Sequence, residues 1–282
     1  MATSLAHQQE WAGENVRITD VERALCELRE ASAHETVGPD LRTSVMTHIA
    51  WVPRDWQEAA LETLAGLAER HPSRAIILFP DPSAPDGLDA RATMLAYSLA
   101  GTRRHVAAEV VELKLRGRRA SVPASIVLPL LIPDLPVFVR WRGQPPFGSP
   151  ELEQLVDLAD RFVVDSSEWP DLPEAYGRLA ALFDRIMCSD IAWRRTASVR
   201  RALAAQWPGI AEAQEVRVAA GPAEALLLQG WLRSRLGRDL KVVTDPDAEL
   251  RVEEQPASEL LSAELDELGP DAVYEATVRA TG

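Results

Sequence analysis

The residues most suggestive of chemistry are His71, Ser73 and Arg74, which precede an apolar run that ends in a Pro-Asp-Pro turn at 80–82. A serine nucleophile needs a histidine base within hydrogen-bond reach, and the reaction needs preorganised donors for the oxyanion. The chain has no GxSxG elbow, and no acid is placed to orient His71. We therefore expect these residues to cap a strand entrance, or to contact a partner or ligand, rather than to catalyse acyl transfer.

Signatures of metal and cofactor binding are missing as well. The five histidines never fall at HxH or HExxH spacing. Neither a GxxxxGK[ST] loop nor a GxGxxG after a strand occurs. Cys26 and Cys188 form no CxxC pair and lie far apart, which fits a reducing cytoplasm. The sequence predicts a cytoplasmic protein without cofactor, metal or enzymatic activity.

The net charge and the hydropathy of the chain argue against two further classes of protein, namely nucleic-acid binders and membrane proteins. The 282-residue chain carries a net charge of −13, which argues against a general nucleic-acid binder. No run of eighteen apolar residues occurs, so we expect no contact with a membrane, and the N-terminus does not read as a signal peptide. Residues 245–282 hold eleven acids and two arginines, whereas 114–119 and 193–201 are basic islands. These opposite charges within one chain raise the question of whether they pair.

Alternating strands and helices must position these residues. The apolar runs at 44–52 and 74–79 flank a helix with a four-four-three apolar stripe, which predicts a right-handed βαβ unit with parallel strands. Further along, the pattern predicts helices at 88–100, 125–132 and 150–160, and strands at 106–117, 135–141 and 161–167. The fold class is therefore α/β, with one open, mostly parallel sheet and flanking helices.

Three regions follow from this pattern. Residues 1–40 are predicted to be a peripheral N-terminal helix and linker, and residues 41–171 the main α/β domain. Residues 172–282 are predicted to form a second, smaller α/β domain with an acidic tail. Within it we expect helices at 172–188 and 194–206, then a strand, a helix and a strand, and finally antiparallel strands in "AELRVEE" and "AVYEATVRA".

Two strand ends form a candidate ligand rim. In open α/β sheets, ligands bind beyond the carboxyl ends of the strands. Polar residues follow two such ends, namely Arg140, Trp141 and Arg142 on one and Asp165, Ser166 and Ser167 on the other. Paired arginines can hold a carboxylate or phosphate by forked hydrogen bonds, so an anionic metabolite is a candidate ligand. The alternative is a solvated rim whose arginines pair with neighbouring carboxylates.

Tryptophan beside arginine marks a candidate protein-binding surface. Trp193, Arg194 and Arg195 adjoin one another in a basic island, and tryptophan with arginine is the composition of interface hot spots. The competing interpretation is that the tryptophans fill a domain junction. Both interpretations put a contact surface near residues 191–201.

Several stretches together resemble one known family. They are "HPSRAIIL", "SIVLPLLIPDLPVFVRWRG", "DRFVVDSSEW", "SDIAWRRTASVRRALAAQW" and "ALLLQGWLRSRLG". In order and spacing they are similar to the OpcA family, the glucose-6-phosphate dehydrogenase assembly proteins of cyanobacteria and actinobacteria. The resemblance spans about residues 40–240, and the acidic segment after 245 matches no block of it.

The resemblance implies a binding protein rather than an enzyme. Family members associate with glucose-6-phosphate dehydrogenase in the oxidative pentose phosphate pathway and promote its active oligomer. Some regulate this through cysteines, a mechanism that we do not transfer to a chain with two cysteines. The expected dehydrogenase surface holds Trp193, Arg194 and Arg195, with the stretch from Arg140 to Arg142 as an optional extension. The alternative function is a sensing module for sugar phosphates or nucleotides at the strand-end rim.

Overall fold

The computed structural model describes residues 3–35, 44–68, 73–99, 105–267 and 269–281. The chain divides into two compact units. Unit 1 comprises residues 1–142 and 148–160, and unit 2 comprises residues 143–147 and 161–282. His71 and most of the predicted linker at 32–40 lie outside the described residues.

Unit 1 contains a sheet and its flanking helices. Its strands are β1 (Thr3–Gly13), β2 (Thr47–Trp51), β3 (Arg74–Asp81), β4 (Gly87–Leu99), β5 (His105–Arg116) and β6 (Val137–Trp141). Its α-helices are α1 (Ile18–Glu35), α2 (Gln57–Ala68), α3 (Pro123–Val127) and α4 (Pro150–Val156). Short 3-10 turns are η1 (Arg54–Trp56), η2 (Gly117–Ser121) and η3 (Leu128–Leu130).

The strands of unit 1 follow the order β1-β4-β5-β3-β2-β6. Strands β5, β3, β2 and β6 are parallel neighbours, and β4 joins β1 to β5 with antiparallel pairing on both sides. The predicted βαβ unit is confirmed, since β2 pairs parallel to β3 across the α2 crossover. The prediction of an α/β fold with a mostly parallel sheet is also confirmed.

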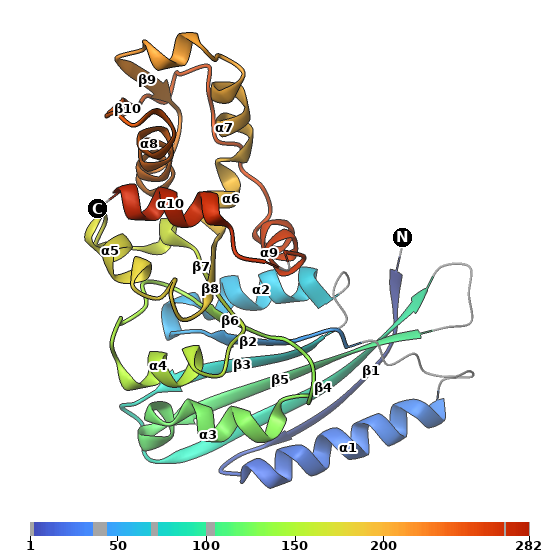
Figure 1. Cartoon of the computed structure of the whole chain (residues 1–282). Coiled ribbons are helices and arrows are strands. Elements are labelled where there is room, and N and C mark those ends of the chain that lie inside the picture. The colour runs from blue at the N-terminus through green and yellow to red at the C-terminus, as the bar shows by residue number, and fades with distance from the viewer. Residues whose placement is uncertain (1–2, 36–43, 69–72, 100–104, 268, 282) are drawn as a thin grey trace. The chain divides into compact units, whose positions relative to one another are not determined.

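Helices cover both faces of this sheet (Figure 1). Helix α1 packs on β4 and β1, while Leu64 and Leu67 of α2 line a groove with Ala75 and Ile77 of β3. The predicted cap of α4 is also confirmed. Ser149 Oγ accepts a hydrogen bond from the backbone N–H of Leu152 at 3.3 Å, and Pro150 begins the helix.

The helix predicted at 88–100 is wrong, because this segment is strand β4. Its alanines favour a helix by propensity. However, Leu88, Ala90, Ala92, Met94 and Ala96 are all buried, and they recur at every second position. That period of two is the strand pattern, and burial of this face decides the structure.

The first forty residues are less peripheral than predicted. Helix α1 is present, with Val21 and Leu25 buried as its spacing predicts. The expectation missed β1, which pairs with β4 over ten register positions from Thr3 to Gly13. This strand continues the antiparallel end of the sheet, so the N-terminal segment is part of unit 1.

Unit 2 is built mainly from short elements. Its strands are β7 (Arg161–Val164), β8 (Met187–Asp190), β9 (Glu215–Val218) and β10 (Lys241–Thr244). Its α-helices are α5 (Glu174–Ala180), α6 (Ile191–Arg195), α7 (Ala197–Ala204), α8 (Pro222–Leu236), α9 (Ala257–Leu265) and α10 (Ala272–Thr281). The 3-10 turns are η4 (Ser166–Glu168) and η5 (Gly209–Ala211). Strand β7 pairs parallel to β8, and β9 pairs parallel to β10.

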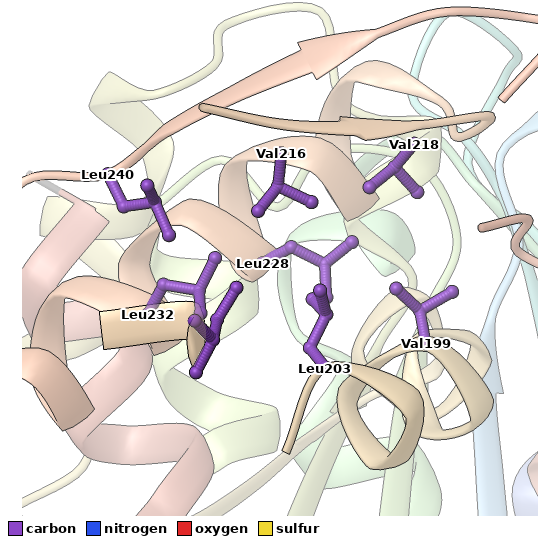
Figure 2. Packing of buried hydrophobic residues seen from close by; sticks show 8 residues of the cluster. Val199, Leu203, Val216, Val218, Leu228, Leu232 and Leu240 are labelled. Atoms are coloured by element: carbon purple, nitrogen blue, oxygen red, sulfur yellow. The ribbon is translucent and has the colours of Figure 1, made fainter. Parts of the chain in front are cut away.

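One hydrophobic cluster of unit 2 joins β9 to α7 and α8. Val216 and Val218 of β9 point toward Leu228 and Leu232 of α8 (Figure 2). Leu203 of α7 and other buried residues complete the cluster: Val199, Ile210 and Leu240. The predicted strand, helix and strand at 214–245 are confirmed. Gly237 ends α8 with a left-handed backbone at φ 66°, a conformation that glycine adopts without steric cost.

Three predictions in unit 2 are corrected. The helix predicted at 172–188 ends at Ala180, and its last residues form strand β8. The strand predicted at 248–254 is reduced to one bridge between Ala219 and Arg251. The strand predicted at 272–280 is helix α10, whose first turn is capped by Asp271 Oδ1 accepting from the N–H groups of Val273 and Tyr274. A cap residue directly before the segment was the signal for a helix.

Among the described residues, no helix combines the length and the apolar character that crossing a membrane requires.

Candidate functional site

The first predicted rim, at the end of β6, is buried. Arg140, Trp141 and Arg142 are all buried. The Trp141 ring stacks on the Trp51 ring with centroids 4.8 Å apart, and Arg142 Cζ lies 4.8 Å from the ring centroid of Trp56. An exposed ligand rim at these three residues is therefore not what the structure shows. A binding role for them remains a prediction.

The second predicted rim meets part of the basic island inside unit 2. Arg195 forms a forked ion pair with Asp165, with Nη1–Oδ1 at 3.0 Å and Nη2–Oδ2 at 2.6 Å. The same guanidinium donates to Ser167 Oγ at 3.0 Å and to Glu224 Oε1 at 3.2 Å. Two carboxylates on one guanidinium raise the Arg195 pKa against the opposing effect of burial, which is the largest single influence. Arg195, which the sequence analysis assigned to a protein-binding surface, thus binds the protein's own carboxylates.

A buried acid that the sequence analysis missed lies beside this pair. Asp190 Oδ1 accepts from the N–H groups of Ser166 at 3.0 Å and Ala192 at 2.9 Å, and Tyr274 Oη donates to its Oδ2 at 3.3 Å. Burial, reinforced by the charge of Asp165, raises the pKa of Asp190 from 3.8 to about 7. The acid ends β8 and caps α6, so its contacts join η4, α6 and α10. The signal that was available is an aspartate immediately before a helix.

Trp193 and Arg194 are covered by the acidic C-terminal segment. Trp193 is 4% exposed, and its Nε1 donates to Asp271 Oδ2 at 2.8 Å. Arg194 Nε donates to Glu264 Oε1 at 2.7 Å, and its Nη2 donates to Glu267 Oε1 at 3.1 Å. The basic island at 193–201 therefore pairs with the acidic segment, whereas Arg116 and Arg118 of the other island pair with Asp89 and Asp86. The expectation of an exposed tryptophan–arginine surface here is wrong, because α9 and the start of α10 lie over it.

Ser73 and Arg74, the described residues of the first cluster, point to opposite faces of the unit 1 sheet. Ser73 lines the groove under α2, whereas Arg74 lines a cavity beside α1. Arg74 Nε donates to Glu109 Oε2 at 2.6 Å, and Arg29 Nε donates to Glu109 Oε1 at 2.5 Å. Adjacent strand residues alternate in direction, so this separation follows from β3 itself. No serine–histidine pair can be drawn from the described residues of this cluster.

An exposed apolar groove lies on unit 2, and the sequence analysis did not select it. It has a volume of about 340 Å³ and is lined by residues of α7, η5, α8 and the turn between α7 and η5: Leu203, Ala204, Trp207, Ile210, Trp231, Leu232, Arg235 and Leu236. We call it the tryptophan groove. Trp207 is 66% exposed, more than any other large apolar side chain that the structure describes as exposed. Leu203 and Leu232 form its floor and belong to the core in Figure 2.

The described residues contain no group of three or more His, Cys, Asp or Glu side chains placed to hold a metal ion. Both cysteines are free thiols, with Cys26 exposed and Cys188 buried. Burial, which outweighs every other influence, raises the pKa of the Cys188 thiol to about 12. A thiol with that pKa is protonated at neutral pH and is a poor nucleophile.

Comparisons with known proteins show which family this chain is similar to. Residues 64–181 match the family model described as "Glucose-6-phosphate dehydrogenase subunit N-terminal domain". This range includes Arg74, Glu109 and the end of β6. The tryptophan groove and the acidic C-terminal segment lie beyond it.

Three curated relatives each carry the name "Putative OxPP cycle protein OpcA". The relative from Synechococcus elongatus is 30% identical over 135 residues, which cover 44% of this chain and 30% of the relative. The relative from Nostoc punctiforme is 26% identical over 181 residues, which cover 60% and 39%. The relative from Synechocystis is 25% identical over 183 residues, which cover 60% and 38%. The chain thus matches between 30% and 39% of each relative's length. The chain is thus similar to this family over residues 64–181, and it is similar to three proteins named OpcA.

Proposed function

We propose that this protein is a non-catalytic partner of glucose-6-phosphate dehydrogenase that promotes the active oligomer of that enzyme. The observation that carries the proposal is the match of residues 64–181 to a domain named for a glucose-6-phosphate dehydrogenase subunit. The relatives' assignment to the OxPP cycle supports the same setting. In this proposal the protein acts in the cytoplasm, as part of the oxidative pentose phosphate pathway.

The tryptophan groove is the surface that we assign to the dehydrogenase. Trp207 and Trp231 present large aromatic faces, and the exposed Arg235 adds a charged group at the edge. Tryptophan and arginine dominate the binding energy of protein interfaces, in particular where apolar neighbours exclude water. The groove therefore suits a dehydrogenase segment that inserts an apolar side chain and places a carboxylate near Arg235.

Activation requires a difference in affinity. A partner shifts an oligomeric equilibrium only by the difference between its affinities for the two states. The chain must therefore bind the active oligomer of the dehydrogenase more tightly than the inactive form. To shift an equal mixture of the two forms to a tenfold excess of one, the chain's binding free energies for the two forms must differ by about 1.4 kcal/mol. One well-packed tryptophan at an interface can supply that difference.

Binding is tested with two matched variants of the full chain. Trp207→Ala removes an exposed aromatic side chain from the groove, and Leu128→Ala removes a 58% exposed apolar side chain from unit 1. Purified glucose-6-phosphate dehydrogenase from the same organism is titrated with each protein by calorimetry. We expect Trp207→Ala to weaken binding by about tenfold or more and Leu128→Ala to leave it unchanged.

The possible results distinguish an error in the choice of surface from an error in the proposed function. Failure of the wild-type chain to bind the dehydrogenase contradicts the proposed function. Equal binding by wild type and Trp207→Ala contradicts only the assignment of the groove.

A further inference from the structure

We infer that the outer edge of strand β1 in unit 1 is a self-association surface, where β1 of a second copy of this chain pairs antiparallel to it. This inference concerns unit 1 alone and does not depend on the proposed function. Strand β1 is the last strand at one side of the sheet, and β4 is its neighbour on the inner side (Figure 1). Every second residue of an edge strand directs its N–H and C=O groups away from the sheet, where another strand can bind them.

The edge of β1 has few of the features that keep edge strands from pairing. Such strands are commonly short, or they carry lysine or proline. Strand β1 has eleven residues without lysine or proline, and Glu10 is its one carboxylate. Its register shift lies between Leu5 and His7. Beyond that shift, no backbone hydrogen bond between described residues joins Gln8–Ala12 to a segment other than β4. Helix α1 packs more extensively on β4 than on β1, so it lies over a face of the sheet.

Symmetry determines which residues of the two copies lie opposite each other. A two-fold axis perpendicular to the sheet keeps its faces aligned, so each residue lies opposite one that is an even number of positions away. A register centred on Glu10 would place the two Glu10 carboxylates directly opposite, which is unfavourable. A register centred on Gln9 instead places the exposed Gln8 of each copy opposite the exposed Glu10 of the other. Each amide can then donate to a carboxylate, and this contact occurs twice.

Gln9 provides a second reason for this register. Its Oε1 atom is buried and accepts no hydrogen bond from the described residues. A buried acceptor without a donor is costly. In the register centred on Gln9, the same residue of the second copy lies directly opposite, and its amide can donate to Oε1 after a rotation about the broad terminal torsion. A second copy always places an amide there, whereas an unrelated strand does so only by chance.

The oligomeric state of the full chain tests the inference. Sedimentation velocity measures the mass over a hundredfold range of protein concentration, and hydrogen exchange is compared between dilute and concentrated samples. We expect a reversible dimer at high concentration, because a short ladder between two chains of net charge −13 gives weak association. The amides of Gln8–Ala12 should exchange more slowly in the dimer, and those of β9 should not change.

Charge variants test the register. Gln8→Glu places like charges opposite each other at both contacts with Glu10, and Gln8→Lys places opposite charges there. We expect the first variant to weaken dimerisation by about threefold or more and the second to strengthen it by a similar factor. Gln206→Glu and Gln206→Lys are the matched controls, because they change the net charge equally at an exposed glutamine of unit 2. They should shift dimerisation much less.

Cross-linking tests the position of the axis. A Cys26→Ser background removes the exposed native thiol. In this background, Gln9→Cys places two thiols across the axis with Cα atoms about 4.5–5.5 Å apart, within reach of a disulfide. Ala12→Cys places a more exposed thiol on the same strand, but its two copies are about 20 Å apart in this register. Mild oxidation should therefore cross-link Gln9→Cys faster, whereas random collisions would favour Ala12→Cys.

Four results would each overturn the inference. They are a monomer at every concentration, equal effects of the Gln8 and Gln206 variants, disulfide formation by Ala12→Cys at least as fast as by Gln9→Cys, and protection of β1 that requires added glucose-6-phosphate dehydrogenase. The last result would assign this edge to the dehydrogenase instead. A cooperative melting transition in each variant verifies that it is folded.

Discussion

Arg194 Nε donates to Glu264 Oε1 at 2.7 Å, and this ion pair joins the basic island after β8 to the acidic segment that follows β10. Glu264 is largely buried, and Arg194 also binds the backbone carbonyl of Ala263 and the more exposed carboxylate of Glu267. Glu264 is therefore part of the packing of unit 2 rather than of a solvated tail. Glu264 and Glu267 bind Arg194, and Asp271 accepts a hydrogen bond from the indole N–H of Trp193.

Breaking this pair should loosen α9. Arg194→Gln leaves the largely buried Glu264 carboxylate without its cation, a change that costs several kcal/mol for a buried pair and less for a partly exposed one. We expect faster amide hydrogen exchange in residues 257–265, with β9 and α8 unchanged. Hydrogen-exchange mass spectrometry measures this effect. Arg201→Gln, which changes an exposed arginine of α7, is the control and should leave the exchange of α9 as in wild type.

Two glycines should respond to alanine in opposite directions. An added Cβ at Gly230 in α8 would lie 2.6 Å from the carbonyl oxygen of Thr277 in α10, too close for any real contact. Gly230→Ala should therefore destabilise the protein by about 1–3 kcal/mol through overpacking. At Gly177 in α5 nothing lies within 4 Å of the added Cβ, so Gly177→Ala should stabilise by about 0.5–1 kcal/mol through helix propensity.

Urea denaturation of both variants measures the difference. Stabilisation by Gly230→Ala would show that α8 and α10 are not packed as closely as the structure has them.

The buried acid Asp190 should make stability depend on pH. Its pKa is raised in the folded state to about 7 from 3.8, chiefly by burial. Below pH 4 the group is protonated in both the folded and the unfolded protein. As the pH rises from 4 to 7, the unfolded chain releases this proton first, so the contribution of Asp190 to the free energy of unfolding falls, and it levels off above 7.

Asp190→Asn removes this titration and retains a side-chain oxygen for the N–H groups of Ser166 and Ala192. The stability of Asp190→Asn relative to wild type should therefore rise between pH 4 and pH 7. Calorimetric melting at a series of pH values measures it. A constant difference between the two proteins across this range would show that Asp190 is not perturbed in the folded state.

The sequence predicts the parallel core of unit 1 well and its antiparallel end poorly. Strands β2, β3, β5 and β6 are continuous apolar runs or clear alternations, and their neighbours fit a right-handed crossover. β4 was missed because alanine has a strong helix propensity, and only pairing with β1 and β5 and burial of one face of the sheet make its period of two decisive. Local propensity and tertiary packing disagree there, and packing prevails.

The functional residues were harder to predict than the fold, because their partners are distant in sequence. The sequence analysis selected Asp165 for a ligand rim and Arg195 for a protein-binding surface, and nothing in their spacing showed that they bind each other. Trp193 and Trp207 both adjoin loop signals in the sequence. Only the structure reveals that Trp207 is exposed and Trp193 is buried. Exposure is a property of the folded chain, so residue type alone does not determine it.

The central claim is tested most directly by the oligomeric state of glucose-6-phosphate dehydrogenase with and without this protein. Mass photometry of the dehydrogenase from the same organism gives its oligomer distribution, and an activity assay on the same samples gives kcat and KM. The account predicts that the full chain joins the dehydrogenase in a complex, shifts the distribution toward the active oligomer and raises kcat/KM. An unchanged oligomer distribution together with unchanged kcat and KM at saturating chain concentration would contradict it.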